Sequence, residues 1–206
     1  MSEVKAFDIG ALFQRIKHTD VLLTPQEKMW VKSKLLDGES HLDIDTHTYI
    51  YVFILSHDPT PENLGIVERF LLKDTEDYVR QAALSCLVKY WDRIENYDEI
   101  IIEALEDMDN EDHESIGIAA CAVVFDIIHR TKNKRLFDAV VRKIKFYMQK
   151  KEQMNGNEEF NFIMLCENLY TRYSEYILGK RDFVTFSRED ALKIGKNYQI
   201  YLPLLK

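Results

Sequence analysis

An acidic motif that recurs at a fixed interval constrains this chain more than any other feature of its sequence. The tetrapeptide 74–77 (Asp-Thr-Glu-Asp) returns 35 residues later as 109–112 (Asp-Asn-Glu-Asp), and the same shift places Cys86 on Cys121. Two Thr-Pro pairs show a similar shift, of 36 residues. Repeats with a period of roughly 20–50 residues are typical of arrays built from one supersecondary unit. The sequence therefore predicts such an array.

Each unit of the array is predicted to contain two helices joined by a short turn. Apolar residues follow the first acidic motif at steps of three and four, at Val79, Ala82, Ala83, Cys86, Leu87 and Tyr90. This spacing lines one face of an α-helix, and the segment before the motif shows it too. We therefore expect four helical hairpins between two capping helices. The hairpins span about 24–56, 60–91, 97–129 and 134–178, and the caps span 4–18 and 187–200.

Local signals support several of these helix boundaries. Thr24 is followed by Pro25 and Glu27, which suits an N-cap, a first helical residue and the partner of a capping box. The segment 187–190 (Ser-Arg-Glu-Asp) carries a similar start signal. The segment 49–55 is rich in residues that favour β-strands. Its position in the period nevertheless predicts a helix.

The segment 71–83 resembles the core of a HEAT-like repeat. In that family an acidic turn follows the first helix, and Val-Arg with small residues opens the second. The residues that match this pattern are Val79, Arg80, Ala82 and Ala83. The resemblance implies an all-α fold, an α-α superhelix of the HEAT-like (armadillo-type) solenoid class, over a single domain, 1–206. It also implies that the second helices line a concave face, which commonly binds a protein.

Composition agrees with a helical array of this kind. The chain has 206 residues, 46% of them hydrophobic, with only 7 Gly and 4 Pro, which favours long helices over turn-rich sheets. Its net charge is −8, which disfavours general nucleic-acid binding and favours a basic partner. No segment has the length and apolarity of a membrane span, and residues 1–20 lack a signal-peptide pattern. We therefore expect a cytoplasmic protein.

The three cysteines are predicted to occupy one position of the repeat. Cys121 follows Cys86 by one period, and Cys166 follows Cys121 after an insertion of about ten residues. They could form a metal or redox ladder along neighbouring second helices. A small apolar residue filling a tight helix contact explains the same pattern, because buried cysteine packs as a small hydrophobe. We favour the packing interpretation. An odd number of cysteines without metal spacing also suits a reducing compartment.

One segment contains side chains that metal ions favour. His41, Asp43, Asp45 and His47 lie close together, and a loop could bring them to a zinc ion. Asp45 also fits the N-cap of a helix. We favour the helix start, and we expect neither a metal nor another cofactor.

A run of carboxylates marks the turn of the third hairpin as a candidate contact surface. The run comprises Glu106, Asp107, Asp109, Glu111, Asp112 and Glu114. A concentrated negative field of this kind attracts a basic partner over a short range. The alternative is a solvated turn that aids solubility. The next helix, 134–151, is strongly basic, and its charges are expected on an outer face that solvent covers.

We interpret the chain as a non-catalytic protein-binding module with a basic partner. The exposed residues expected on the second helices add Tyr78, Gln81 and Lys89 to the candidate contact residues. A compact acidic array suits an inhibitor or immunity protein that masks a basic toxin, such as a nuclease. No membrane partner is expected, nucleic acid is disfavoured, and the sequence leaves the oligomeric state open.

Two other classes of function stay open at the level of sequence. Some HEAT-like proteins are DNA glycosylases with a basic concave groove, and others resemble bilin lyases. Here the positive charge concentrates on a first helix, which the family geometry places on the convex side. The third class is a structural scaffold subunit, for which exposed apolar surface at the ends of the array would be the discriminating feature.

Overall fold

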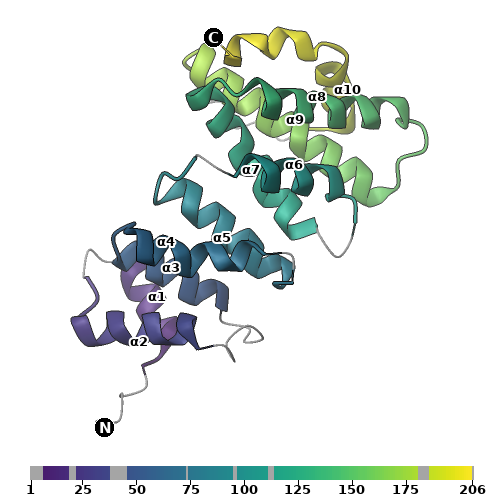
Figure 1. The fold of residues 1–206 in the computed structure, drawn as a ribbon. Coiled ribbons are helices and arrows are strands. Elements are labelled where there is room, and N and C mark those ends of the chain that lie inside the picture. The colour runs from purple at the N-terminus through teal and green to yellow at the C-terminus, as the bar shows by residue number, and fades with distance from the viewer. Residues whose placement is uncertain are drawn as a thin grey trace. The chain divides into compact units, whose positions relative to one another are not determined.

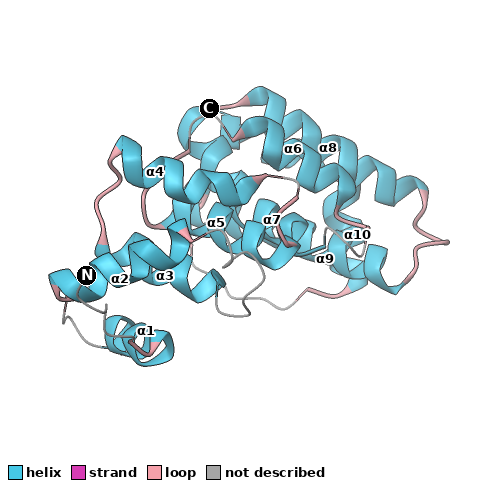
Figure 2. Cartoon of the chain, turned by 60° about the horizontal axis from the view of Figure 1, so that its bottom comes forward, coloured by secondary structure: helices cyan, strands magenta, loops and turns pink. Residues whose placement is uncertain are grey.

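Helices account for all the regular structure in the part of the chain that the structure describes. The structure is a computed structural model, and the described residues are 7–18, 22–37, 46–72, 74–94, 97–110, 114–180 and 186–205. No strand occurs among them (Figure 2). The predicted all-α class is confirmed. None of the helices in these ranges has both the length and the apolarity needed to cross a membrane.

The chain divides into two compact units, Met1–Arg93 and Ile94–Lys206. The boundary falls between the second and third predicted hairpins. Each unit contains helices from two of the predicted hairpins and one predicted cap.

Unit 1 is built around α3, which packs against three other helices (Figure 1). Its elements are α1 (Ile9–His18), α2 (Pro25–Leu36), α3 (Thr46–Ser56), α4 (Pro61–Glu68), the 3-10 turn η2 (Arg69–Leu71) and α5 (Asp77–Lys89). Helices α1, α2 and α5 all pack on α3. The core includes Val31, Leu35, Ile50, Phe53, Phe70 and Leu87, all fully buried. Burial of such side chains contributes about 1.5–3 kcal/mol each.

The predicted start of α2 and the predicted helix at 49–55 are both confirmed. The backbone N–H of Glu27 donates to Thr24 Oγ1 at 3.3 Å, and the backbone N–H of Thr24 donates to Glu27 Oε2 at 2.8 Å. Arg15 of α1 forms an ion pair with Glu27 at 2.5 Å, which joins α1 to the start of α2. Segment 49–55 lies within α3, where most of its side chains are buried. Burial among helices therefore outweighs its strand propensity.

Unit 2 contains the third and fourth predicted hairpins and the C-terminal cap. Its elements are α6 (Asp98–Asp107), α7 (Glu114–Thr131), α8 (Lys134–Gln149), α9 (Gly156–Ile177), α10 (Arg188–Lys196) and the 3-10 segment η4 (Tyr198–Leu205). Helix α6 packs against α7 and α8, and α9 packs against α7, α8 and α10. Helices α6 and α7 meet very closely at Gly117, since a Cβ atom there would lie 2.4 Å from Met108 Cβ.

The C-terminal cap differs from the single helix expected at 187–200. The start is confirmed, because Ser187 and Asp190 form a capping box. However, α10 ends at Lys196, and the chain continues as η4, which contains Pro203. Proline lacks an N–H donor and clashes with the preceding helical turn, so it disfavours a continuous α-helix through this segment.

The three cysteines lie in the cores of the second helices, as the packing interpretation predicts. Cys86 in α5, Cys121 in α7 and Cys166 in α9 are buried and free. Burial raises the pKa of Cys86 and of Cys121 to about 12, and it raises the pKa of Cys166 as well. These thiols therefore stay protonated at neutral pH and pack as apolar side chains.

Candidate functional site

The acidic run of the third hairpin divides into exposed and inward-facing carboxylates. Glu106 and Asp107 end α6 and are exposed, and Asp107 makes no ion pair with any described residue. Asp109 follows in the turn, and its side chain is only 20% exposed. Glu111 and Asp112, together with the side chain of Glu114, lie outside the described residues.

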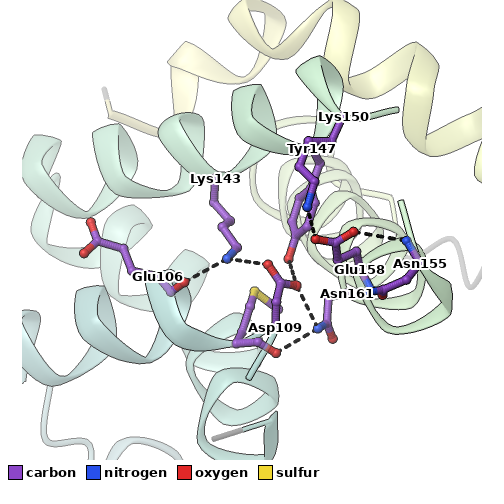
Figure 3. Close-up of polar contacts among 9 residues, drawn as sticks. Glu106, Asp109, Lys143, Tyr147, Lys150, Asn155, Glu158 and Asn161 are labelled. Carbon is purple, nitrogen blue, oxygen red and sulfur yellow. Dashed lines mark hydrogen bonds and ion pairs between the residues drawn. The ribbon is translucent and has the colours of Figure 1, made fainter. Parts of the chain in front are cut away.

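Asp109 connects the turn after α6 to α8 and α9 (Figure 3). Its Oδ2 accepts a hydrogen bond from Lys143 Nζ at 2.8 Å. Its Oδ1 accepts one from the Tyr147 hydroxyl at 2.6 Å and one from Asn161 Nδ2 at 3.2 Å. Asn161 Nδ2 also donates to the backbone oxygen of Met108 at 2.8 Å. Because Lys143 neutralises it, Asp109 adds less to an external negative field than the sequence predicts.

Lys143 is a buried cation, although the sequence places the charges of this helix on its outer face. Its side chain is 7% exposed. In addition to Asp109, its ammonium donates to the backbone oxygen of Glu106 at 2.9 Å. That oxygen belongs to the last turn of α6, where carbonyl groups lack helical partners and the helix dipole favours a cation. Lys143 therefore caps α6 from the neighbouring helix.

These contacts set the pKa values of the two central groups. Burial alone would raise the pKa of Asp109, but the hydrogen bonds from Lys143 and Tyr147 outweigh it, and the pKa is lowered. Burial raises the pKa of Tyr147 strongly, and the hydrogen bond to Asp109 adds to this increase. Asp109 is therefore ionised at neutral pH and Tyr147 is a neutral donor.

The start of α9 lies beside this cluster and holds a second ion pair. Asn155 is the N-cap, and its Oδ1 accepts from the backbone N–H of Glu158 at 2.9 Å. Glu158 Oε2 accepts from the backbone N–H of Asn155 at 3.1 Å, which completes a capping box. Glu158 Oε1 pairs with the ammonium of Lys150 of α8 (Figure 3). Both partners are thus held in place by the packing of α8 on α9.

A pocket of about 400 Å³ opens among these residues, and we call it the α6–α8 pocket. It is lined by Glu106, Asp109, Ala139, Arg142, Lys143, Phe146 and Glu158. Glu106 and Arg142 are exposed and form an ion pair at 3.2 Å. Phe146 is 41% exposed, so the pocket joins an aromatic wall to exposed charges. Two residues of the predicted acidic run, Glu106 and Asp109, line this pocket.

The candidate contact residues of α5 lie in unit 1. Tyr78 and Lys89 are exposed, as predicted, and Gln81 is half-buried. Tyr78 also meets the ring of His47 of α3 edge-on, with the ring centroids 6.2 Å apart. The structure therefore leaves these three side chains on the accessible side of α5 in unit 1.

Sequence reasoning missed an aromatic cluster that shares the same two helices. The rings of Tyr51 (α3) and Tyr90 (C-terminal to α5) lie 5.4 Å apart, and their hydroxyls are 3.5 Å apart. Phe13 of α1 packs on Tyr51 with a centroid distance of 5.1 Å. Tyr90 is 45% exposed, and tyrosine is favoured in protein interfaces. The signal in the sequence was an aromatic residue at the end of one second helix and another within the preceding one.

The second helices of unit 2 carry a polar cluster that joins α7 to α9. Asp126 accepts from the Tyr176 hydroxyl at 2.6 Å and from Arg172 Nε at 3.0 Å. Arg172 also pairs with Glu175 at 2.8 Å. The ring of His129 stacks on that of Tyr176, with 4.1 Å between the centroids. Burial lowers the pKa of His129, so this ring is largely neutral at pH 7. The cluster forms a half-buried surface held together by its own ion pairs.

The predicted alternative of a metal site falls mostly outside the described residues. His41, Asp43 and Asp45 lie there, while His47 is exposed on α3 and contacts the Thr48 hydroxyl at 3.2 Å. Among the described residues, no three or more His, Cys, Asp or Glu side chains are grouped so that they could hold a metal ion. Comparison of the chain with protein-family models, curated proteins and solved structures found no match.

Proposed function

We propose that this chain is a non-catalytic protein-binding module with the architecture of a HEAT-like α-α superhelix. Two ion pairs support stacked hairpins within unit 2. Glu99 pairs with Arg135, and Glu106 pairs with Arg142, each across 36 residues, which is one repeat period. Both pairs join the first helix of one hairpin to the first helix of the next.

The partner in this proposal is a basic protein that contacts the turn after α6. The observation that carries the proposal is the exposure of Glu106 and Asp107 beside the α6–α8 pocket. An exposed aromatic ring next to unpaired carboxylates is a combination that interfaces favour, because the ring supplies contact area and the charges select a cationic partner. The net charge of −8 attracts the same kind of partner over longer distances.

Within this class, an inhibitor or immunity protein that masks a basic toxin suits the chain best. A nuclease binds phosphates through a positive surface, and an acidic protein of 206 residues is large enough to cover one. Complementary charge also speeds association, which favours rapid neutralisation of a toxin.

The test is affinity capture from the native host at low salt, with wild type and a charge-reversal variant as bait. The variant carries Glu106→Lys and Asp107→Lys, which reverse the two exposed carboxylates. The control is Glu152→Lys, since Glu152 is 79% exposed and does not line the pocket. We expect wild type and control to retain a basic protein that the variant loses. Capture that is insensitive to the reversal, or that selects acidic proteins, would reject the proposal.

A captured nuclease allows a direct assay of inhibition. The purified chain should slow cleavage of nucleic acid by that nuclease, with a stoichiometric end point. The charge-reversal variant should need a higher concentration for the same inhibition, and the difference should shrink as salt is added.

A further inference from the structure

The α6–α8 pocket has an inner part whose charges are already satisfied. Lys143 donates to Asp109 and to the backbone of Glu106, and Lys150 pairs with Glu158 (Figure 3). Lys143, Asp109 and Glu158 are largely buried, so they are poorly placed to exchange partners with an incoming group. Recognition of a ligand therefore depends on the exposed part of the lining.

That exposed part carries an excess of negative charge. Glu106 and Arg142 are 58% and 57% exposed, and they share one contact of 3.2 Å through Glu106 Oε1. Exposed pairs of this kind contribute little to stability and exchange readily. Asp107, the next residue, is exposed and unpaired among the described residues. A cation therefore gains a carboxylate partner here, whereas an anion would meet two carboxylates and one guanidinium.

Phe146 supplies a surface that suits a cation rather than an uncharged group. The ammonium nitrogens of Lys143 and Lys150 lie 5.3 Å and 5.0 Å from the centroid of its ring. The electron-rich face of the ring thus already attracts positive charge, and its exposed part remains free for more. A planar guanidinium can stack on such a ring and still donate in its own plane to a carboxylate, which a hydrated ammonium does less well.

We propose that the α6–α8 pocket receives an arginine side chain of the basic partner, with the guanidinium on Phe146 and hydrogen-bonded to Glu106. This inference rests on the proposed function and adds the chemical group that is recognised. Arg142 yields its single contact with Glu106 when the ligand binds, and the methylene groups of the ligand arginine lie against Ala139. The pocket volume of about 400 Å³ accommodates such a side chain.

The test uses three short peptides of one Gly-Ser sequence with arginine, citrulline or lysine at the centre. Citrulline keeps the shape of arginine and removes its charge. Binding is followed by amide chemical shifts of the isotope-labelled full chain. We expect the arginine peptide to shift the amides around 106–109 and 139–146, the lysine peptide to bind more weakly, and the citrulline peptide to leave them unchanged.

Two variants locate the binding on the chain. Phe146→Ala and Glu106→Gln should each weaken binding of the arginine peptide by about threefold or more. Glu152→Gln is the matched control and should bind as wild type does. Spectra of the free variants verify that each remains folded. Equal shifts with the arginine and citrulline peptides, or unchanged affinity in Phe146→Ala, would overturn the inference.

The outcomes also separate this inference from the proposed function. If the peptides fail but reversal of Glu106 and Asp107 still releases a captured basic protein, the pocket assignment is wrong and the binding function stands. If the arginine peptide binds as expected but no captured protein responds to the reversal, the pocket assignment stands and the proposed function is wrong.

Discussion

The ammonium of Lys143 lies 2.8 Å from Asp109 Oδ2, although 34 residues separate them along the chain. One residue belongs to α8 and the other to the turn after α6. The pair is shielded from water on most sides, and Tyr147 and Asn161 donate to the second oxygen of Asp109. A single carboxylate thus joins the turn of one hairpin to both helices of the next. This pair connects the candidate contact surface to the stability of unit 2.

Replacement of Lys143 by methionine should destabilise unit 2 by about 3 kcal/mol, because it leaves the carboxylate of Asp109 buried without its cation. The measurement is urea unfolding followed by circular dichroism. Arg142→Met is the matched control on the same helix. It removes an exposed ion pair and should cost less than about 1 kcal/mol. Equal losses in the two variants would show that the Lys143 pair has no special role.

The pair of changes Lys143→Met and Asp109→Asn should cost less than the sum of the two single changes. Each single change strands one partner, whereas the double change removes both charges. A double-mutant cycle from urea unfolding gives the coupling directly. Strict additivity would mean that the two side chains do not interact in solution.

The stability that Asp109 contributes should depend on pH in a defined direction. Its pKa in the folded chain lies below the usual value of 3.8, so the unfolded chain binds more protons in the interval between them. Its contribution is therefore complete above the unfolded pKa and is lost as pH falls through the folded pKa. Wild type should exceed Asp109→Asn in unfolding free energy at pH 7, and the gap should close towards pH 3. A gap that widens on acidification would contradict this sign.

Two substitutions of glycine by alanine should have opposite effects. In Gly117→Ala the new Cβ would lie 2.4 Å from Met108 Cβ and 2.9 Å from Met108 Cα, so α7 must shift away from the turn. We expect a loss of about 2 kcal/mol. In Gly65→Ala nothing lies within 4 Å of the new Cβ. Because alanine favours the helix, a gain of about 0.5–1 kcal/mol is expected. Thermal unfolding measures both, and a stable Gly117→Ala would exclude the close contact.

The three thiols should be unreactive in the folded chain. All are buried, and burial raises the pKa of Cys86 and of Cys121 to about 12, so the thiolate is scarce at pH 8. A chromogenic disulfide reagent should titrate three thiols in denaturant and react very slowly without it. Rapid reaction of one thiol in native buffer would place that cysteine at the surface.

The helices of this chain could be predicted well because their signals are local and periodic. Thr24 with Glu27, and Ser187 with Asp190, mark helix starts through contacts between residues three positions apart. Segment 49–55 needed more than propensity, since its composition favours a strand. Its place in the 35-residue period was sufficient, because a helix at that position can bury its apolar side chains between its neighbours.

The candidate site was predicted only in part. The sequence identifies the acidic run, but it does not distinguish the exposed Asp107 from the inward-facing Asp109. It also places Lys143 among exposed charges. The spacing held a signal, because Leu136, Val140, Lys143 and Tyr147 follow each other at steps of four, three and four, which puts all four on the buried face of α8. A lysine on such a face requires a buried acceptor.

The sequence by itself determined that the chain forms helices, where most of them begin, and which faces are apolar, since hydrogen bonds and side-chain spacing within a few residues control these properties. Only the tertiary structure decided which charges remain available to a partner. A carboxylate of the acidic run faces solvent or is neutralised according to which side chain of another helix reaches it. For Asp109 that side chain is Lys143, 34 residues away, and for Asp107 no described residue supplies a counter-charge.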